Sequence, residues 1–266
     1  MRSVCAATIG VCSAMLCTLT GAAHGATLAA SYGFQSTLAA DQAGVADLGV
    51  VDPTNTSHFE TANVFGIDRT TWRWSGTTTP AEQGGLTFGS SGLLNSNSYS
   101  VELVFSFDVD NGWRRIVDVL NRGNDTGFYI DPENKVDVYP VGAGTTDYIA
   151  QTFHHVVLTV APGATPTRGG LSPSHVSAYL DGAPEFSLDT DVMNISGDNL
   201  VSLFLDNNQG VAQQEWSAGN IALARFYDGA LTDSEVLDLY QGVSPTPGTT
   251  ALTGAVGFVG LRRKRR

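Results

Sequence analysis

The sequence predicts an all-β fold, a double-sheet jelly roll that is followed by one short helix near the C-terminus. Three observations lead to this expectation. Apolar and polar residues alternate in many short segments, as they do in half-buried strands. Gly, Asn, Asp and Ser gather between these segments, as they do in turns. Residues 26–243 alone have the size of one β-sandwich domain.

The clearest alternation places four apolar residues, at every second position from Val101 to Phe107, on one strand face. Asp110-Asn111-Gly112 then predicts a tight turn, so we expect a hairpin with a strand at 113–120. Asp181-Gly182 predicts a second hairpin. Further strands are expected at 28–34, 86–88, 127–130, 135–139, 153–160, 176–180, 185–188, 200–205 and 221–227.

One helix start is marked by Thr232-Asp233-Ser234-Glu235. This is the capping-box pattern, in which the Thr232 hydroxyl accepts from the Glu235 amide and the Glu235 carboxylate reaches back to the first residue. Val236, Leu237 and Tyr240 form an apolar stripe behind it. These strands and this helix complete the jelly-roll prediction.

The first 25 residues have the layout of a secretory signal peptide, with a basic start, an apolar stretch and small residues before the end. A buried N-terminal helix is the alternative. All three cysteines, Cys5, Cys12 and Cys17, lie in this segment. The exported chain is therefore expected to have neither a disulfide nor a thiolate metal site.

Residues 244–266 contain Pro245-Thr246-Pro247, an apolar run and five terminal cations. The run is shorter than the ~20 residues of a spanning helix, and the cations form a stop-transfer flank. This order resembles the bacterial PEP-CTERM sorting signal. The resemblance implies transient membrane anchoring through 249–266, removal by an exosortase-like enzyme, and delivery to the cell envelope, cell surface or extracellular matrix. A plain C-terminal anchor or a disordered tail is the alternative.

The domain between these ends is strongly acidic. All 26 Asp and Glu but only eight of the 14 Lys and Arg lie in residues 26–243, which gives this part a formal charge of −18. Such a charge repels phosphate backbones and anionic lipid. We therefore expect no nucleic-acid partner.

Two stretches, Asn97 to Asp131 and Leu200 to Tyr240, resemble a concanavalin A-like lectin/glucanase domain of the laminin G-like kind. The resemblance extends over most of residues 28–240, and Arg225-Phe226-Tyr227 leads into the short helix as it does in that family. It implies the concanavalin A-like jelly roll. The fold hosts lectins, glycosidases, adhesins and structural modules, so it does not fix the function.

Two departures from the family bear on chemistry. Glycosidases of this fold carry Glu-x-Asp-x-x-Glu on one strand, and that spacing is absent here, so we do not expect an enzyme. Many members bind structural calcium through an Asp at the position where this chain has Ala222. Whether calcium binds elsewhere stays open, and no other cofactor is expected.

Four tryptophans are candidates for sugar stacking. Trp72 and Trp74 share one strand face, which is a binding platform if it is exposed and core if it is not. Trp113 lies at a predicted strand start, and Trp216 lies in a polar segment, so either can border a site. Asp206, Asn207 and Asn208 follow a predicted strand and can meet sugar hydroxyls, or simply form a turn. Asp206 is also the candidate calcium ligand.

These observations predict an exported bacterial surface or extracellular-matrix protein whose laminin G-like domain binds a polysaccharide or glycan, without catalysis. A structural or protein-binding surface module is the first alternative. A divergent glycoside hydrolase is the second, and it would need two carboxylates that face each other across a cleft.

Overall fold

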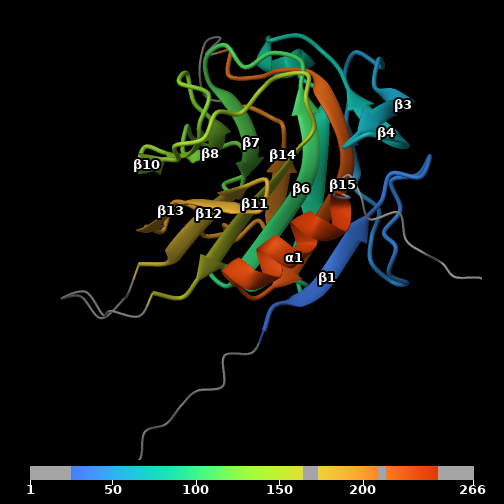
Figure 1. The fold of residues 1–266 in the computed structure, drawn as a ribbon. Helices are drawn as coiled ribbons and strands as arrows, with labels where there is room; N and C mark the ends of the chain where they lie inside the picture. Colours follow the sequence, from blue (N-terminus) through green and yellow to red (C-terminus); the bar gives the residue numbers. More distant parts are fainter. Residues whose placement is uncertain (1–24, 164–172, 209–213, 245–266) are drawn as a thin grey trace, which may run out of the picture.

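The computed structural model describes residues 25–163, 173–208 and 214–244. Two antiparallel sheets pack face to face, and one helix lies against one of them (Figure 1). The predicted signal peptide and sorting segment lie outside the described residues, apart from Gly25 and Ser244 at their borders. Within the described part, no helix is long and apolar enough to cross a membrane. The all-β jelly-roll prediction is confirmed.

Sheet A has eight strands and sheet B has seven. The strands of sheet A, in spatial order, are β13 (Ala183–Asp189), β12 (His175–Leu180), β11 (His154–Ala161), β6 (Tyr99–Phe107), β15 (Gly219–Asp228), β4 (Ile67–Trp74) and β3 (His58–Val64), with β1 (Thr27–Tyr32) also paired to β15. Those of sheet B are β10 (Gly142–Ala143), β9 (Val136–Tyr139), β8 (Gly127–Ile130), β7 (Arg114–Asp118), β14 (Leu200–Leu203), β5 (Gly85–Gly89) and β2 (Gly49–Val51). A single 3-10 turn, η1 (Pro80–Glu82), precedes β5.

The core fills the space between the inner faces of the two sheets. The alternate residues from Val101 to Phe107 point into it, as the alternation predicts. Phe88 of β5 stacks on Phe226 of β15 with 3.9 Å between ring centroids, and this contact joins the two sheets. Because each sheet buries one face against the other, this packing supplies most of the apolar burial of the domain.

The predicted hairpin between residues 101–107 and 113–120 is wrong. β6 pairs with β11 and β15 in sheet A, whereas β7 pairs with β8 and β14 in sheet B. The turn signal at Asp110-Asn111-Gly112 predicts a reversal of the chain, but it does not determine which strand pairs with β6. The Arg114 guanidinium donates to the Asn111 and Gln214 carbonyl groups, and these bonds hold the crossing segment.

The hairpin predicted at Asp181-Gly182 is confirmed, because it joins β12 to β13. Both turn residues have positive φ, 50° at Asp181 and 77° at Gly182, as a two-residue hairpin of this kind requires.

Helix α1 (Asp233–Val243) begins with the predicted capping box, and both of its hydrogen bonds form. Val236 packs with Val157, Tyr179 and Tyr227, which lie on the outer face of sheet A, the face turned away from sheet B. The helix therefore covers part of that outer face (Figure 1).

Candidate functional site

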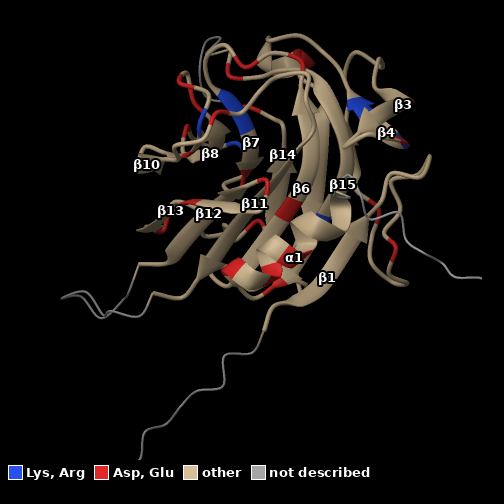
Figure 2. Cartoon of the chain, in the orientation of Figure 1, with Lys and Arg blue, Asp and Glu red and all other residues tan. Residues whose placement is uncertain are grey.

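The outer face of sheet B carries buried charge at β7, where Arg115 is 1% exposed. Arg115 pairs with Tyr129 of β8, while the neighbours of Tyr129 in β8, Phe128 and Ile130, point into the core. Figure 2 shows the basic segment of β7 among acidic loop segments at this end of the sheet. A cation in this position must be compensated, because burial of an unpaired charge is costly.

Three carboxylates and one aromatic ring surround the Arg115 guanidinium. Nη1 lies 2.7 Å from Asp118, Nη2 lies 3.7 Å from Asp125, and Nε lies 3.8 Å from Asp206. The guanidinium carbon is 4.7 Å from the centroid of the Tyr129 ring, within cation–π range. Arg115 thus ties the segments that follow β7 and β14 to the sheet.

Arg122 fixes the same segments from the side. Its Nε donates to the Asp206 carbonyl at 2.5 Å, and its Nη2 donates to Gln83 Oε1 at 3.1 Å. The Arg122 amide donates to Asp118 at 2.7 Å. The segments that carry Asp118 and Asp206 are therefore fixed by contacts with Arg115 and Arg122.

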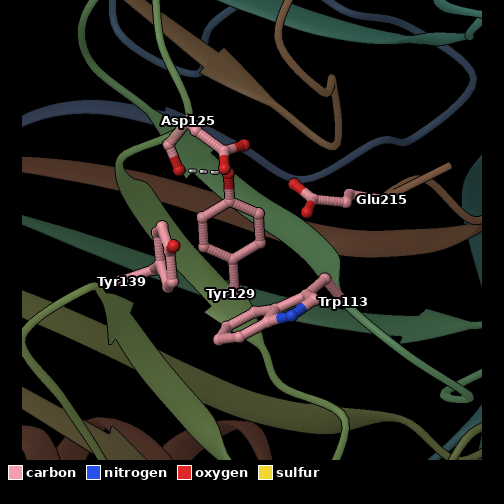
Figure 3. A pocket seen from close by; sticks show the side chains of 5 residues that line it. All are labelled: Trp113, Asp125, Tyr129, Tyr139 and Glu215. Atoms are coloured by element: carbon pink, nitrogen blue, oxygen red, sulfur yellow. Dashed lines mark hydrogen bonds between the residues drawn. The ribbon is translucent and has the colours of Figure 1, made fainter. Parts of the chain in front are cut away.

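A cavity of about 50 Å³ opens beside this network. It is lined by Trp113, Asp125, Tyr129, Tyr139 and Glu215 (Figure 3). The Trp113 ring is nearly perpendicular to both tyrosine rings, with centroids 5.5 Å from Tyr129 and 5.0 Å from Tyr139. Trp113 and Tyr139 are partly exposed, whereas Tyr129 is buried and donates its hydroxyl to the Asp125 carbonyl at 2.9 Å. The result is an aromatic rim around an acidic opening.

The acidic side of the cavity contains Asp125 and Glu215, and Asp206 lies behind them. One oxygen from each of these three carboxylates lies within 4.8 Å of the others. Glu215 Oε2 is inaccessible to solvent and finds no hydrogen-bond donor among the described residues. Burial, followed by the charges of Asp206 and Asp125, raises the pKa of Glu215 to about 8. Glu215 therefore carries a proton at neutral pH.

These three oxygens are also ligands of the type that calcium prefers, although calcium takes six to eight. The positive charge among them is supplied by Arg115, which lies within 4 Å of Asp125 and Asp206. A metal at this place would therefore have to share its ligands with a buried guanidinium.

Three of the predicted tryptophans belong to the core and form no binding platform. Trp74 and Trp72 are 0% and 8% exposed, because their shared face of β4 is the inner face of sheet A. Trp74 stacks on Phe204 at 3.9 Å and donates its indole N–H to the Ser217 carbonyl. Trp216 is 5% exposed and donates to the Gly84 carbonyl. The prediction of these three as ligand-binding residues is corrected by their burial.

The remaining candidates lie at or beside the cavity. Trp113 lines it. Asp206 is buried next to Arg115, and Asn207 donates its side-chain amide to Asp125 Oδ1 at 2.9 Å, so both support the site from behind. Asn208 is exposed and does not line the cavity.

Four lining residues were not among the candidates: Asp125, Tyr129, Tyr139 and Glu215. The sequence did carry a signal for the two tyrosines. Tyr129 lies between two apolar residues of a predicted strand, and Tyr139 follows the apolar Val138, so each tyrosine points to the face opposite its apolar neighbours. No periodicity marks Asp125 or Glu215, which lie in connecting segments 90 positions apart.

Comparison with known proteins identifies the family of this chain. A family model described as the concanavalin A-like lectin/glucanases superfamily matches residues 80–237, which is more than half of the sequence. The chain belongs to the concanavalin A-like lectin/glucanases superfamily. A search of curated proteins finds no match.

Two solved structures are similar to this chain in fold. Domain 4 of an extracellular arabinanase from Geobacillus stearothermophilus, solved with arabinotriose, is 19% identical with a TM-score of 0.60 over 82% of this chain and 100% of that one. The binding domain of botulinum neurotoxin DC, solved with SialylT, is 11% identical with a TM-score of 0.54 over 83% of this chain. This chain spans about half of that neurotoxin chain, at 52%. At these identities the likeness establishes the fold.

Proposed function

We propose that this protein is an exported glycan-binding module of the bacterial cell surface or extracellular matrix, and that the cavity at Trp113 is its binding site. The observation that carries the proposal is the combination of a partly exposed aromatic rim with carboxylates at the outer face of sheet B. Aromatic faces stack on the apolar faces of sugar rings, and carboxylates accept hydrogen bonds from hydroxyl groups. The carbohydrate complex of the arabinanase domain, which shares this fold, is consistent with such a role.

The site is shallow, so the proposal is for weak binding at each copy and for avidity along a repeating polymer. A cavity of about 50 Å³ holds a few water molecules and is much smaller than a pocket that encloses a ligand, which is typically about 300 to 1,000 Å³. A sugar would stack on Trp113, with Tyr139 beside it and one substituent in the cavity.

The proposal is for binding without hydrolysis. Glycosidases of this fold carry Glu-x-Asp-x-x-Glu on one strand, and this chain lacks that spacing. Of the three carboxylates at the cavity, Asp206 is 1% exposed and lies behind the other two. The proposed module therefore retains its ligand unchanged.

Export is the second part of the proposal, and it rests on the sequence. Residues 1–25 would direct secretion, and residues 244–266 would anchor the chain until an exosortase-like enzyme releases it. A protein-binding or structural surface module remains the alternative function.

The test is a panel of immobilised polysaccharides, probed with the purified protein with and without EDTA. We expect saturable binding that falls about 3- to 10-fold in Trp113→Ala, because an aromatic contact of about 0.5 to 1.5 kcal/mol is lost with the ring. Leu237→Ala is the matched control, since this apolar side chain is 44% exposed on α1, away from sheet B.

Absence of binding to every polysaccharide, by folded protein, would favour the structural alternative. Release of reducing ends from a bound polysaccharide would overturn the non-enzymatic reading.

A further inference from the structure

The cavity has room for one small substituent, and its chemistry indicates which one. Two of its five lining residues, Asp125 and Glu215, are acidic, and the other three are aromatic. The Glu215 oxygen that faces no donor is hidden from solvent. A group that enters beside it is stabilised if it offers a hydrogen-bond donor or a positive charge.

The buried cations do not fully neutralise these acids. Arg115 makes its short contact, 2.7 Å, with Asp118 and lies 3.7 Å from Asp125. Arg122 donates to carbonyl and amide oxygens and not to a carboxylate of the cavity. Arg114 donates to carbonyl groups and to Asn111. Among the described residues, no Lys or Arg forms an ion pair with Glu215.

We propose, on the basis of the glycan-binding function above, that the cavity selects amino sugars with a free ammonium group. The ammonium would lie between Asp125 and Glu215, and the sugar ring would stack on Trp113 with Tyr139 beside it. An ammonium group brings three donors and a full charge. It also lies next to aromatic rings, which attract cations.

The charge of the whole domain supports the same ligand class. Residues 26–243 carry a formal charge of −18. A polymer with free ammonium groups is a polycation, so it is attracted over a long range before any specific contact forms. An N-acetyl group at the same position has neither the charge nor the three donors, and a hydroxyl group has one donor.

Proton release provides a readout that a purely steric site would lack. Glu215 faces the carboxylates of Asp125 and Asp206 and the guanidinium groups of Arg115 and Arg114, with Asp118 and Arg122 behind them. Its raised pKa keeps it protonated near pH 6.5. A bound ammonium favours the carboxylate form, so binding near pH 6.5 should release a proton.

The experiment compares three β-1,4-linked tetrasaccharides that differ only at C2, namely those of glucosamine, N-acetylglucosamine and glucose. Affinity is measured by titration calorimetry at pH 6.5 in two buffers that differ in ionisation enthalpy. We expect the glucosamine tetramer to bind at least about 10-fold more tightly than the other two, as charge-assisted hydrogen bonds allow. We also expect proton release with that ligand alone.

Glu215→Gln and Asp125→Asn test the assignment to these residues. Each should reduce the preference to less than about 3-fold, and Glu215→Gln should abolish proton release. Glu215→Gln resembles the protonated side chain that the free site already holds, so the fold should persist. Leu237→Ala serves as the control that retains the preference.

Equal affinity for the three tetramers would overturn the inference. Calcium chloride titrated alone is the second arm, and calcium binding that is lost in Glu215→Gln would overturn it as well, because the carboxylates would then form a metal site. If other polysaccharides bind through Trp113 while none of the tetramers does, the inference fails and the glycan-binding proposal stands. If no glycan of any kind binds, the proposed function itself fails.

Discussion

The outer faces of the two sheets both bury charge, but they balance it differently. On sheet A, Glu102 is 0% exposed and accepts from Tyr227 at 2.6 Å and from His155 at 3.2 Å. Arg225 adds a charged contact at 3.4 Å. On sheet B, the single guanidinium of Arg115 forms ion pairs with Asp118, Asp125 and Asp206.

The pKa values of the carboxyl groups show the difference. Burial alone would raise the pKa of Glu102, but the hydrogen bond from His155, with Arg225 and Tyr227, holds it below its usual value. Burial raises the pKa of Asp118 and of Asp206, and their partners do not reverse that shift. Buried charge by itself therefore does not mark a site. The functional candidate is the face whose acids remain under-compensated beside an opening.

The largest expected effect comes from removing the cation of sheet B. Arg115→Met should lower the free energy of unfolding by roughly 3 to 5 kcal/mol, because it leaves Asp118 and Asp206 buried without their partner. Urea unfolding measures this.

Arg73→Met is the matched control. Arg73 pairs with Asp108 at a partly exposed position, so its loss should cost about 1 kcal/mol or less. If Arg115→Met costs no more than Arg73→Met, the cluster on sheet B is not held by its cation.

A smaller loss is expected on sheet A. Glu102→Gln should cost roughly 2 kcal/mol, because the buried Tyr227 and His155 lose a charged acceptor. Glycan affinity should not change, since Glu102 lies on the outer face of sheet A and the cavity lies at the outer face of sheet B. Affinity that fell with this variant would show that the two faces are coupled and would break the comparison.

The smallest effect depends on pH and concerns Asp137, which pairs with Tyr129 on the outer face of sheet B. Burial, then the charges of Asp131 and Glu133, raises the pKa of Asp137 to about 6, from an ordinary value near 4. Because the folded protein holds this proton more tightly than the unfolded chain, Asp137 favours folding below about pH 4. That contribution is lost as the pH rises through about 6.

Asp137→Asn should accordingly be more stable than the unchanged protein by roughly 1 to 2 kcal/mol at pH 7, and the difference should vanish near pH 4. Urea midpoints of both proteins at the two pH values decide this. A difference that is the same at both would assign the effect to packing and not to charge.

Periodicity and local chemistry determine several elements of this fold without reference to any tertiary contact. The alternation from Val101 to Phe107 gave the core face of β6, because successive strand residues point to opposite sides. The capping box at Thr232 located the start of α1, and Asp181-Gly182 located a hairpin, because both depend on residues next to each other in the chain.

Tertiary structure decided what local patterns cannot carry. A turn signal predicts that the chain reverses, but only the packing of the two sheets placed β6 in sheet A and β7 in sheet B. Alternation placed Trp72 and Trp74 on one face, but the position of sheet B made that face the core. Asp125 and Glu215 meet at the cavity because both lie beside Arg115, and no spacing in the sequence encodes a contact between residues 90 positions apart.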